Sequence, residues 1–520
     1  MPLSPAELKQ RLASGEELAL LDVREQGVHY RGHPFFASCA PLSRLELVIG
    51  DLVPRRSAPI VVLDSGQETL AQQAAARLKS LGYEDVEVLE GGCAAWKASG
   101  GELFGGVNVP SKAFGEFVEH EYDTPRIPPQ ELKRLQESGE KMVILDSRPY
   151  EEFHRMNIPG ALDAPGAELV FRVHEVAPDP STLVVVNCAG RTRSIIGCQS
   201  LRNAGIPNRV VALKDGTMGW ELAGFTCERG TTRIAPMPSK ENLAKAQAAA
   251  RRAAQKFSVR FVSPGEVKAW EQDPRRTLYL LDVRTREEFE AKHIAGSRHA
   301  PGGQLVQATD EYVGVRNARI VLVDPERVRS VMTASWLVQM GWKDACVLDA
   351  EGFSGFDIES GPAPRCEPPR WPSVAPGDLD KAASVIDFST SLRYRSRHVP
   401  GAWWAVRSRL EQARSRIGAA GRIVLTSEDG RLAHLVAPEA AALWKGADVR
   451  VLEGGNAAWF AAGLPSDAGL ERATTATDDV WWKPYDHATD YEKHAREYLS
   501  WETALVEQIK RDPTIRFVKA

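Results

Sequence analysis

The sequence predicts an α/β protein of four tandem units, each a doubly wound parallel sheet flanked by helices, followed by a helical C-terminal tail. Apolar segments that end in aspartate recur at Asp22, Asp146, Asp282 and Asp387. A second apolar segment follows each of them and leads into a helical stretch, at residues 59–64, 182–187, 319–324 and 422–427. Continuous apolar strands that alternate with helices are typical of parallel sheets buried on both faces. Right-handed crossovers between such strands produce a doubly wound fold.

The length and the repeat spacing set the domain organisation. A chain of 520 residues is expected to form three to five domains, at roughly 100–200 residues each. The four aspartates lie between 105 and 136 residues apart, which is a domain-sized period and not that of a solenoid. We therefore expect units 1 to 4 at residues 1–105, 106–235, 236–370 and 371–470, with the tail at residues 471–520.

Further elements repeat in the same order within the units. The first strand continues to an arginine two residues later in three units, at Arg24, Arg148 and Arg284. A turn of the type Ile-Pro-Gly-Ala follows, at residues 157–161, 293–297 and 398–402. Three units close on Gly-x-x-x-Trp, at residues 92–96, 216–220 and 455–459. Ser4-Pro5 and Ser263-Pro264, each followed by a glutamate, predict capping boxes at two equivalent helix starts.

Composition excludes several classes of function. The formal net charge of −4 gives no reason to expect a nucleic acid or an anionic membrane as partner. No apolar run of about 18 residues is present, and the first residues lack the pattern of a signal peptide. The seven cysteines include no Cys-x-x-Cys pair, so we expect neither a metal site nor a disulfide framework. These features indicate a cytoplasmic protein, and no motif indicates a cofactor.

The chemistry is concentrated in residues 184–197, Val-Val-Val-Asn-Cys-Ala-Gly-Arg-Thr-Arg-Ser-Ile-Ile-Gly. Cys188 stands where the predicted strand ends, and ligands of parallel α/β domains bind at that end of the sheet. The backbone N–H groups of the following loop and the positive end of the next helix can surround the sulfur. Arg191 and Arg193 add positive charge. All of these effects favour the thiolate, so we expect Cys188 to be a nucleophile for an anionic substrate.

The neighbouring residues receive supporting roles. We expect Arg191 and Arg193 to bind substrate, together with the loop residues Ala189, Gly190, Thr192 and Ser194. Thr192 and Ser194 also shape the loop and cap the helix. Asp146 and Arg148 are interpreted as a pair that ties the strand end, with Arg148 as additional support for the pocket.

On the strand end Asp-x-Arg, the Ile-Pro-Gly-Ala turn, the loop Cys-Ala-Gly-Arg-Thr-Arg and the closing Gly-x-x-x-Trp, the chain resembles four tandem domains of the rhodanese family of sulfurtransferases. The resemblance covers nearly all of the chain outside the linkers and the tail. It implies an enzyme that carries sulfane sulfur as a persulfide on Cys188. The implied donor is thiosulfate or a similar small anion, from which sulfite leaves. The implied acceptor is cyanide, a thiol or an acceptor protein.

Two alternatives remain open from the sequence. The chain could be a rhodanese-repeat scaffold or persulfide carrier for a protein partner. It could also be a cysteine-dependent phosphatase or arsenate reductase, although those phosphatases have five residues between cysteine and arginine. Here four residues separate Cys188 from Arg193, and the shorter loop makes a smaller cradle. Asn187 also stands where such phosphatases usually have histidine.

The other three units lack the cysteine. Alignment places Ser65 opposite Cys188 in unit 1, Asp324 in unit 3 and a residue between Ser427 and Asp429 in unit 4. None of these residues can form a persulfide, so we expect those units to be inactive. Aromatic residues of the tail, Trp481, Trp482 and Tyr485, are expected to anchor it onto the domains.

Overall fold

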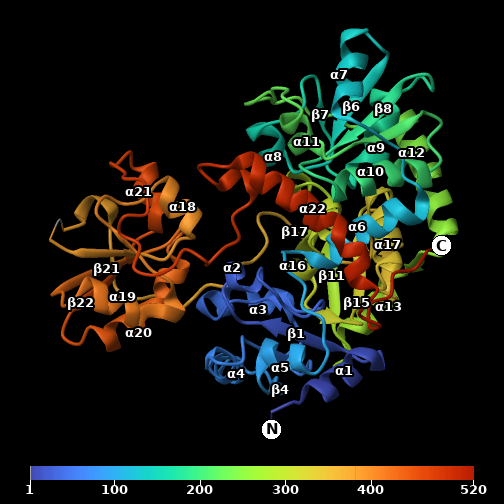
Figure 1. Ribbon diagram of the computed structural model, residues 1–520. Coiled ribbons are helices and arrows are strands. Elements are labelled where there is room, and N and C mark those ends of the chain that lie inside the picture. The colour runs from blue at the N-terminus through green and yellow to red at the C-terminus, as the bar shows by residue number, and fades with distance from the viewer. Residues whose placement is uncertain (1, 381, 520) are drawn as a thin grey trace.

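The computed structural model describes residues 2–380 and 382–519 and confirms the α/β architecture (Figure 1). Within these residues the chain forms four five-stranded sheets. Units 2, 3 and 4 share one strand order, β5-β9-β8-β6-β7, β10-β16-β15-β11-β13 and β18-β22-β21-β19-β20, and all neighbours in these sheets are parallel. A repeated sequence pattern has therefore folded into a repeated topology.

The strands of the four units are short. Unit 1 contains β1 (Leu18–Asp22), β2 (Ser38–Cys39), β3 (Ile60–Leu63) and β4 (Val86–Val88). Unit 2 contains β5 (Arg126–Ile127), β6 (Met142–Asp146), β7 (Leu162–Asp163), β8 (Leu183–Asn187) and β9 (Val210–Leu213). Unit 3 contains β10 (Arg260–Val262), β11 (Leu278–Asp282), β12 (His293–Ile294), β13 (Arg298–His299), β14 (Val315–Arg316), β15 (Arg319–Val323), β16 (Ala345–Leu348) and β17 (Ile358–Glu359). Unit 4 contains β18 (Ser373–Val374), β19 (Ser384–Asp387), β20 (Trp403–Trp404), β21 (Arg422–Thr426) and β22 (Asp448–Leu452).

Helices cover both faces of each sheet. Unit 1 has α1 (Pro5–Ser14), α2 (Gln26–His29), α3 (Leu45–Leu52), α4 (Leu70–Ser80) and α5 (Gly92–Ala98). Unit 2 has α6 (Val109–Tyr122), α7 (Pro129–Glu137), α8 (Tyr150–Arg155), α9 (Glu168–Val176), α10 (Thr192–Asn203) and α11 (Gly216–Leu222). Unit 3 begins with α12 (Lys240–Lys256) and also has α13 (Pro264–Glu271), α14 (Arg286–Ala291), α15 (Gly302–Gln307), α16 (Thr309–Tyr312) and α17 (Arg329–Gln339). Unit 4 has α18 (Ser391–Ser396), α19 (Leu410–Ile417), α20 (Arg431–Leu443) and α21 (Gly455–Ala461), and the tail has α22 (Tyr491–Ile509).

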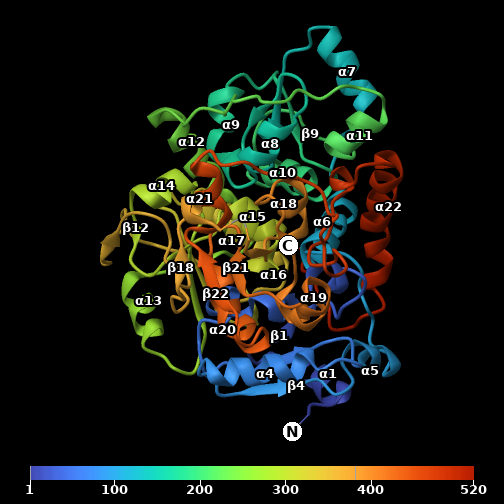
Figure 2. The same cartoon turned by 90° about the vertical axis from the view of Figure 1, so that its left-hand side faces the viewer.

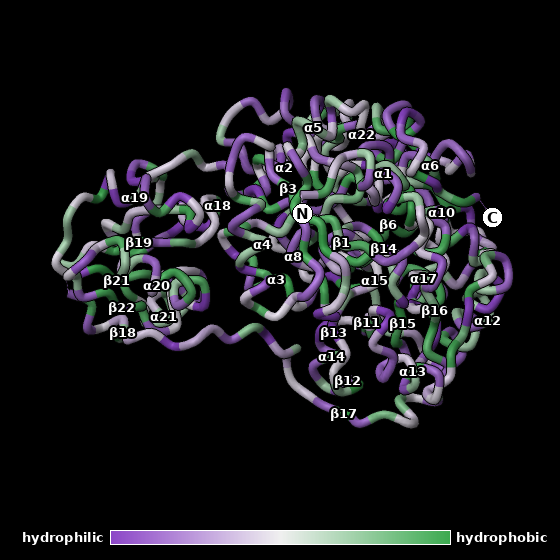
Figure 3. Tube along the Cα trace, turned by 90° about the horizontal axis from the view of Figure 1, so that it is seen from below, coloured by the Kyte–Doolittle hydropathy of each residue, from purple (hydrophilic) through white to green (hydrophobic). Residues whose placement is uncertain are grey.

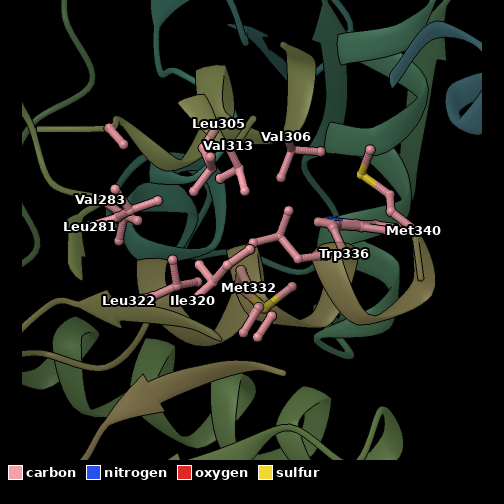
Figure 4. Packing of buried hydrophobic residues seen from close by; sticks show 14 of the residues in the cluster. Leu281, Val283, Leu305, Val306, Val313, Ile320, Leu322, Met332, Trp336 and Met340 are labelled. Carbon is pink, nitrogen blue, oxygen red and sulfur yellow. The ribbon is translucent and has the colours of Figure 1, made fainter. Parts of the chain in front are cut away.

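Burial on both faces explains the continuous apolar strands. In β8, Val184 and Val186 belong to one hydrophobic cluster, whereas Leu183 and Val185 belong to another on the opposite face. The first of these clusters extends through units 1, 2 and 3. In unit 3, strand residues such as Ile320 and Leu322 pack beside α17, as Figure 4 shows. The three units therefore share one continuous hydrophobic cluster, and each has a separate cluster on the other face of its sheet.

Unit 4 has hydrophobic clusters of its own and stands apart from the other three units in Figure 1, whereas in Figure 2 it is seen in front of them. Two connecting segments join it to the rest of the chain, as the tube in Figure 3 shows. An ion pair also connects unit 4 to unit 1: the Arg407 guanidinium lies 2.8 Å from the Glu46 carboxylate. Unit 4 is thus attached to the larger body mainly through its linkers and polar contacts.

One strand departs from the parallel pattern predicted for unit 1. Strand β14 comes from unit 3 and pairs antiparallel with β1, with Leu18 opposite Arg316. The shared hydrophobic cluster brings the two units close enough for a strand of unit 3 to join the sheet of unit 1. The domain boundaries given above remain a prediction. Strand β14 belongs to unit 3 by its place in the sequence and to the sheet of unit 1 by its pairing.

Local sequence features explain several helix starts and one interdomain contact. Capping boxes form at Ser4 and Ser263, as predicted. Helix α12 carries a stripe of alanines, all of them buried, at positions 246, 249, 250, 253 and 254. It packs between α9 of unit 2 and α17 of unit 3 and acts as a brace between those units.

Candidate active site

Cys188 lies directly after β8, in the loop that leads to α10. Its side chain is only 2 % exposed. The sulfur lies 3.5 Å from the hydroxyl oxygen of Ser194. Helix α11 closes the other side of the loop, because the N–H of Thr217 donates to the Cys188 carbonyl at 2.9 Å and that of Met218 donates to the Ala189 carbonyl at 3.0 Å. The cysteine is therefore held between two helix N-termini.

The sheet register shows which residues replace the cysteine elsewhere. Asn187 lies opposite Asp146, and the equivalent strand residues are Leu63, Val323 and Thr426. The next residue along the chain is Asp64 in unit 1, Asp324 in unit 3 and Ser427 in unit 4. The alignment of Ser65 with Cys188 was wrong by one residue, because the loop residues carry no pattern that fixes an ungapped register. The placements in units 3 and 4 are consistent with this register.

The loop of unit 3 shows what such a loop can bind. One carboxylate oxygen of Asp324 accepts hydrogen bonds from three backbone N–H groups, those of Val328 at 3.0 Å, Arg329 at 2.8 Å and Ser330 at 3.3 Å. Asp64 of unit 1 similarly accepts from Gly66 at 2.7 Å and Ala71 at 3.0 Å. In both units an anion occupies the position of the cysteine side chain.

The corresponding N–H donors of unit 2 belong to Thr192, Arg193 and Ser194. These residues follow Cys188 at the same spacing at which Val328, Arg329 and Ser330 follow Asp324. These residues begin α10, and the first N–H groups of a helix have no acceptor within the helix. They also lie at the positive end of the helix dipole. The loop can therefore stabilise a negatively charged sulfur in the way that unit 3 stabilises its carboxylate.

Arg191 is buried and extensively paired. Its guanidinium binds Glu116 through two hydrogen bonds of 2.7 Å, also contacts Glu119, and lies 3.2 Å from Asp215. Only 5 % of the residue is exposed. Burial lowers the pKa of Arg191, but these carboxylates outweigh it and raise the pKa above its ordinary value. Arg191 was expected to bind substrate, and nothing near it in the sequence indicated a pairing with Glu116 on α6.

The structure predicts that Arg191 mainly stabilises the fold. Replacing it in Arg191→Met leaves buried carboxylates unpaired, which is expected to cost about 3 kcal/mol. The expected observation is a lower Tm by calorimetry, partly restored by adding Glu116→Gln. A variant with unchanged Tm and a raised KM for the sulfur donor would instead support the expected role in substrate binding.

Arg193 forms a second ion pair, which is partly buried, with Glu152 of α8. Its two terminal nitrogens lie 3.0 and 2.9 Å from the carboxylate oxygens. Burial raises the pKa of Glu152, yet Arg193 and other cations lower it to about 2. The positive charge of Arg193 also interacts with Cys188. Arg193 therefore remains close to the sulfur while its charge is balanced by Glu152.

Asp146 and Arg148 tie the end of β6 to the neighbouring turn. The Arg148 guanidinium donates to Asp146 at 2.8 and 2.7 Å and to the Met156 carbonyl at 2.6 Å. Asn187 donates to the same Asp146 carboxylate at 2.9 Å. The pairs Asp22–Arg24 and Asp282–Arg284 repeat the arrangement. This geometry accounts for the recurrent Asp-x-Arg motif as a structural element beneath the site.

Asp163 of β7 gives the site region a dependence on pH. It is opposite Asp146 in the register, and burial followed by the Asp146 charge raises its pKa to about 8. The folded pKa lies above the ordinary value near 3.9, so stability falls as the pH rises from about 4 to 8. Asp163→Asn is therefore expected to raise stability by about 5 kcal/mol at pH 8 and little at pH 4. Thermal melts at both pH values test this, and an equal gain at both would refute it.

The C-terminal helix covers the cysteine loop, which the sequence did not reveal. Glu502 of α22 accepts hydrogen bonds from Thr192 at 3.2 Å and Tyr498 at 2.9 Å, and it pairs with Lys112 of α6 at 2.9 Å. A side chain at Gly190 would lie 3.3 Å from the Tyr498 ring. The tail is anchored as expected at Trp481, whose ring stacks on those of Tyr30 and Tyr498. Amphipathic spacing predicts such a helix but not the surface that it covers.

Two negative findings concern the described residues. In residues 2–380 and 382–519, no cluster of three or more histidine, cysteine or acidic side chains is suited to hold a metal ion. Across the same part of the chain, no helix combines the length and apolar character that are needed to cross a membrane.

Comparison with known proteins places this geometry in a family. The model of the rhodanese-like domain matches residues 4–99, 128–223 and 263–359. The chain belongs to the rhodanese-like domain family. Unit 4 lies outside these matches but has the strand order of units 2 and 3. Cys188 thus lies in the second of the three matched regions.

The chain is also similar to a crystal structure entitled thiosulfate sulfurtransferase, from Pseudomonas aeruginosa. The two are 48 % identical, the match covers 99 % of each chain, and the TM-score is 0.94. Part of the chain is 37 % identical, over 101 residues, to the HTH-type transcriptional regulator Rv0324 of Mycobacterium tuberculosis (strain ATCC 25618 / H37Rv). That match covers 19 % of this rhodanese chain and 43 % of the regulator, so the chain spans less than half of that relative's length.

Proposed function

We propose that this chain is a thiosulfate sulfurtransferase of the rhodanese family, with a persulfide on Cys188 as its intermediate. The observation that carries the proposal is the position of Cys188 in a loop whose counterparts in units 1 and 3 hold a carboxylate. The similarity to the Pseudomonas aeruginosa thiosulfate sulfurtransferase supports the same reaction class.

The reaction needs one nucleophile and a stabilised leaving group. The Cys188 thiolate attacks the outer sulfur of thiosulfate, the bond between the two thiosulfate sulfurs breaks, and sulfite leaves with the bonding electrons. The new terminal sulfur carries the negative charge and accepts hydrogen bonds from the N–H groups of Thr192, Arg193 and Ser194. Such preorganised backbone donors act like an oxyanion hole. Cyanide then attacks the terminal sulfur, thiocyanate departs, and the Cys188 thiolate is regenerated.

The remaining loop residues support this chemistry. Ser194 contacts the sulfur and also donates to the Arg191 carbonyl at 2.8 Å, which fixes the first turn of α10. Ala189 and Gly190 let the loop pass beneath α22. Because Cys188 is 2 % exposed, the buried position favours a small donor and a small acceptor, such as cyanide or a low-molecular-weight thiol, over an acceptor protein. The cytoplasmic location stays a prediction.

The intact mass of the purified protein tests the proposal. Incubation with thiosulfate is expected to add one sulfur atom, and cyanide is expected to remove it with formation of thiocyanate. Failure to gain sulfur at any thiosulfate concentration would contradict thiosulfate as the donor. Sulfur that cyanide does not remove would contradict the persulfide.

A further inference from the structure

A cavity of about 420 Å³ lies where unit 2, unit 4 and the tail meet. Helix α8 lines one side, α18 of unit 4 lines another, and tail residues Trp481, Lys483, Tyr485 and Asp486 complete the wall. In Figure 1 the red tail runs from unit 4 toward α8. Glu152, the partner of Arg193, is among the lining residues. The cavity therefore adjoins the ion pair next to the cysteine loop.

The charges of the cysteine loop are already balanced by carboxylates. Arg191 faces Glu116, Glu119 and Asp215, and Arg193 faces Glu152. Four carboxylates thus pair with these two guanidiniums, so the two arginines leave no net positive charge. An anionic donor that approaches Cys188 needs cations that are not committed to such pairs.

Lys483 of the tail and Arg393 of α18 meet this requirement. Both line the cavity, both side chains are exposed, and within residues 2–380 and 382–519 neither forms an ion pair with a carboxylate. Although Lys483 is exposed, the protein atoms around it exclude part of its hydration shell, which lowers its pKa. Tyr485 and Glu152 outweigh this effect and raise the pKa overall, so the ammonium group stays charged at neutral pH. Two cations from different parts of the chain therefore face one cavity.

Other contacts hold the Lys483 segment in place. The Arg155 guanidinium of α8 lies 4.6 Å from the centre of the Tyr485 ring and 3.7 Å from the Asp486 carboxylate. The Arg395 guanidinium of α18 donates to the Asp486 carbonyl at 2.7 Å. The segment is thus fixed against units 2 and 4 by neighbours that, among the described residues, leave Lys483 itself without an ion-pair partner.

We propose that Lys483 and Arg393 bind the negatively charged end of the sulfur donor, the sulfonate of thiosulfate, so that the tail and unit 4 complete the active site of unit 2. This inference rests on the proposed sulfurtransferase function. Charge-assisted hydrogen bonds from an ammonium and a guanidinium suit the oxygens of a sulfonate. The proposal gives a unit without the cysteine a direct part in substrate binding.

Steady-state kinetics of Lys483→Ala and Arg393→Ala test the proposal. Each variant is expected to raise the KM for thiosulfate about tenfold while kcat changes by less than about twofold. The conservative variant Lys483→Arg should retain most of the affinity. Lys493→Ala is the matched control, because Lys493 lies on the exposed face of α22, where it pairs with Glu497. Unchanged KM values in both alanine variants would overturn the proposal.

A second measurement does not depend on sulfur transfer. The rates at which anionic iodoacetate and neutral iodoacetamide alkylate Cys188 are compared in each protein. We expect Lys483→Ala to lower the ratio of the iodoacetate rate to the iodoacetamide rate about tenfold. If thiosulfate adds no sulfur to the unmodified protein but this ratio still falls, the proposed function fails and the anion subsite stands. If sulfur is added and the ratio is unchanged, the subsite is refuted and the function stands.

Discussion

Cys188→Ala is expected to abolish persulfide formation and to reduce thiocyanate production from thiosulfate and cyanide by at least about a thousandfold. No other cysteine of the described chain stands at the end of a central strand beneath a helix N-terminus. The alanine fits the loop without new contacts, so Tm should change little. Thiocyanate production and calorimetry measure the two effects.

Cys198→Ala is the matched control for this experiment. Cys198 is also buried, lies ten residues further along the chain in α10, and has its sulfur 3.8 Å from the Pro125 carbonyl oxygen. Burial raises the pKa of its thiol to about 12, so it is not a nucleophile at neutral pH. Loss of turnover in Cys198→Ala with turnover retained in Cys188→Ala would refute the assignment. Survival of the physiological function in Cys188→Ala would favour a scaffold.

Gly216→Ala is expected to lower turnover about a hundredfold, because it displaces the cysteine loop. Gly216 begins α11 with φ of +57°, a conformation that alanine rarely adopts. A Cβ atom there would overlap the carbonyl oxygen of Cys188 and approach that of Gly190 to 2.8 Å. The loop must move, and the backbone donors would then no longer converge on the sulfur. Rates of persulfide formation measure the effect.

Gly92→Ala provides the matched control in unit 1. Gly92 has φ of +51°, and its Cβ would overlap the carbonyl oxygen of Asp64, the counterpart of Cys188. We expect a comparable loss of Tm in both variants but a large loss of turnover only in Gly216→Ala. Equal turnover in the two variants would contradict the idea that loop geometry in unit 2 governs the reaction.

Much of this architecture could be predicted because it is recorded locally in the sequence. The segment Leu183–Asn187 begins with four apolar residues that cover both faces, so it predicts a central parallel strand. The polar residues that follow mark the carboxyl end of the strand, where parallel sheets bind their ligands. The capping box at Ser4 and the glycine at position 216 each determine a helix start through residues that are close together in the sequence. Cys188 could be singled out for the same reason, since the loop and the helix that surround it follow it directly.

Apart from the one-residue error in the register of the unit 1 loop, the parts that escaped prediction depend on contacts between distant segments. Glu116 pairs with Arg191 from 75 residues away, and Glu502 reaches Thr192 from 310 residues away. Strand β14 joins a sheet in another unit for the same reason. A pair of opposite charges has no spacing rule when tertiary packing alone brings its members together. The sequence could therefore identify the nucleophile but not the partners of its arginines.

The most direct test of the central claim is to locate the transferred sulfur. The protein is incubated with thiosulfate and digested with trypsin without reduction, and the mass of the peptide at residues 173–191, whose single cysteine is Cys188, is measured. We predict that this peptide gains one sulfur atom and that the peptides with the other six cysteines gain none. Sulfur on a different cysteine, with the 173–191 peptide unmodified, would contradict the account.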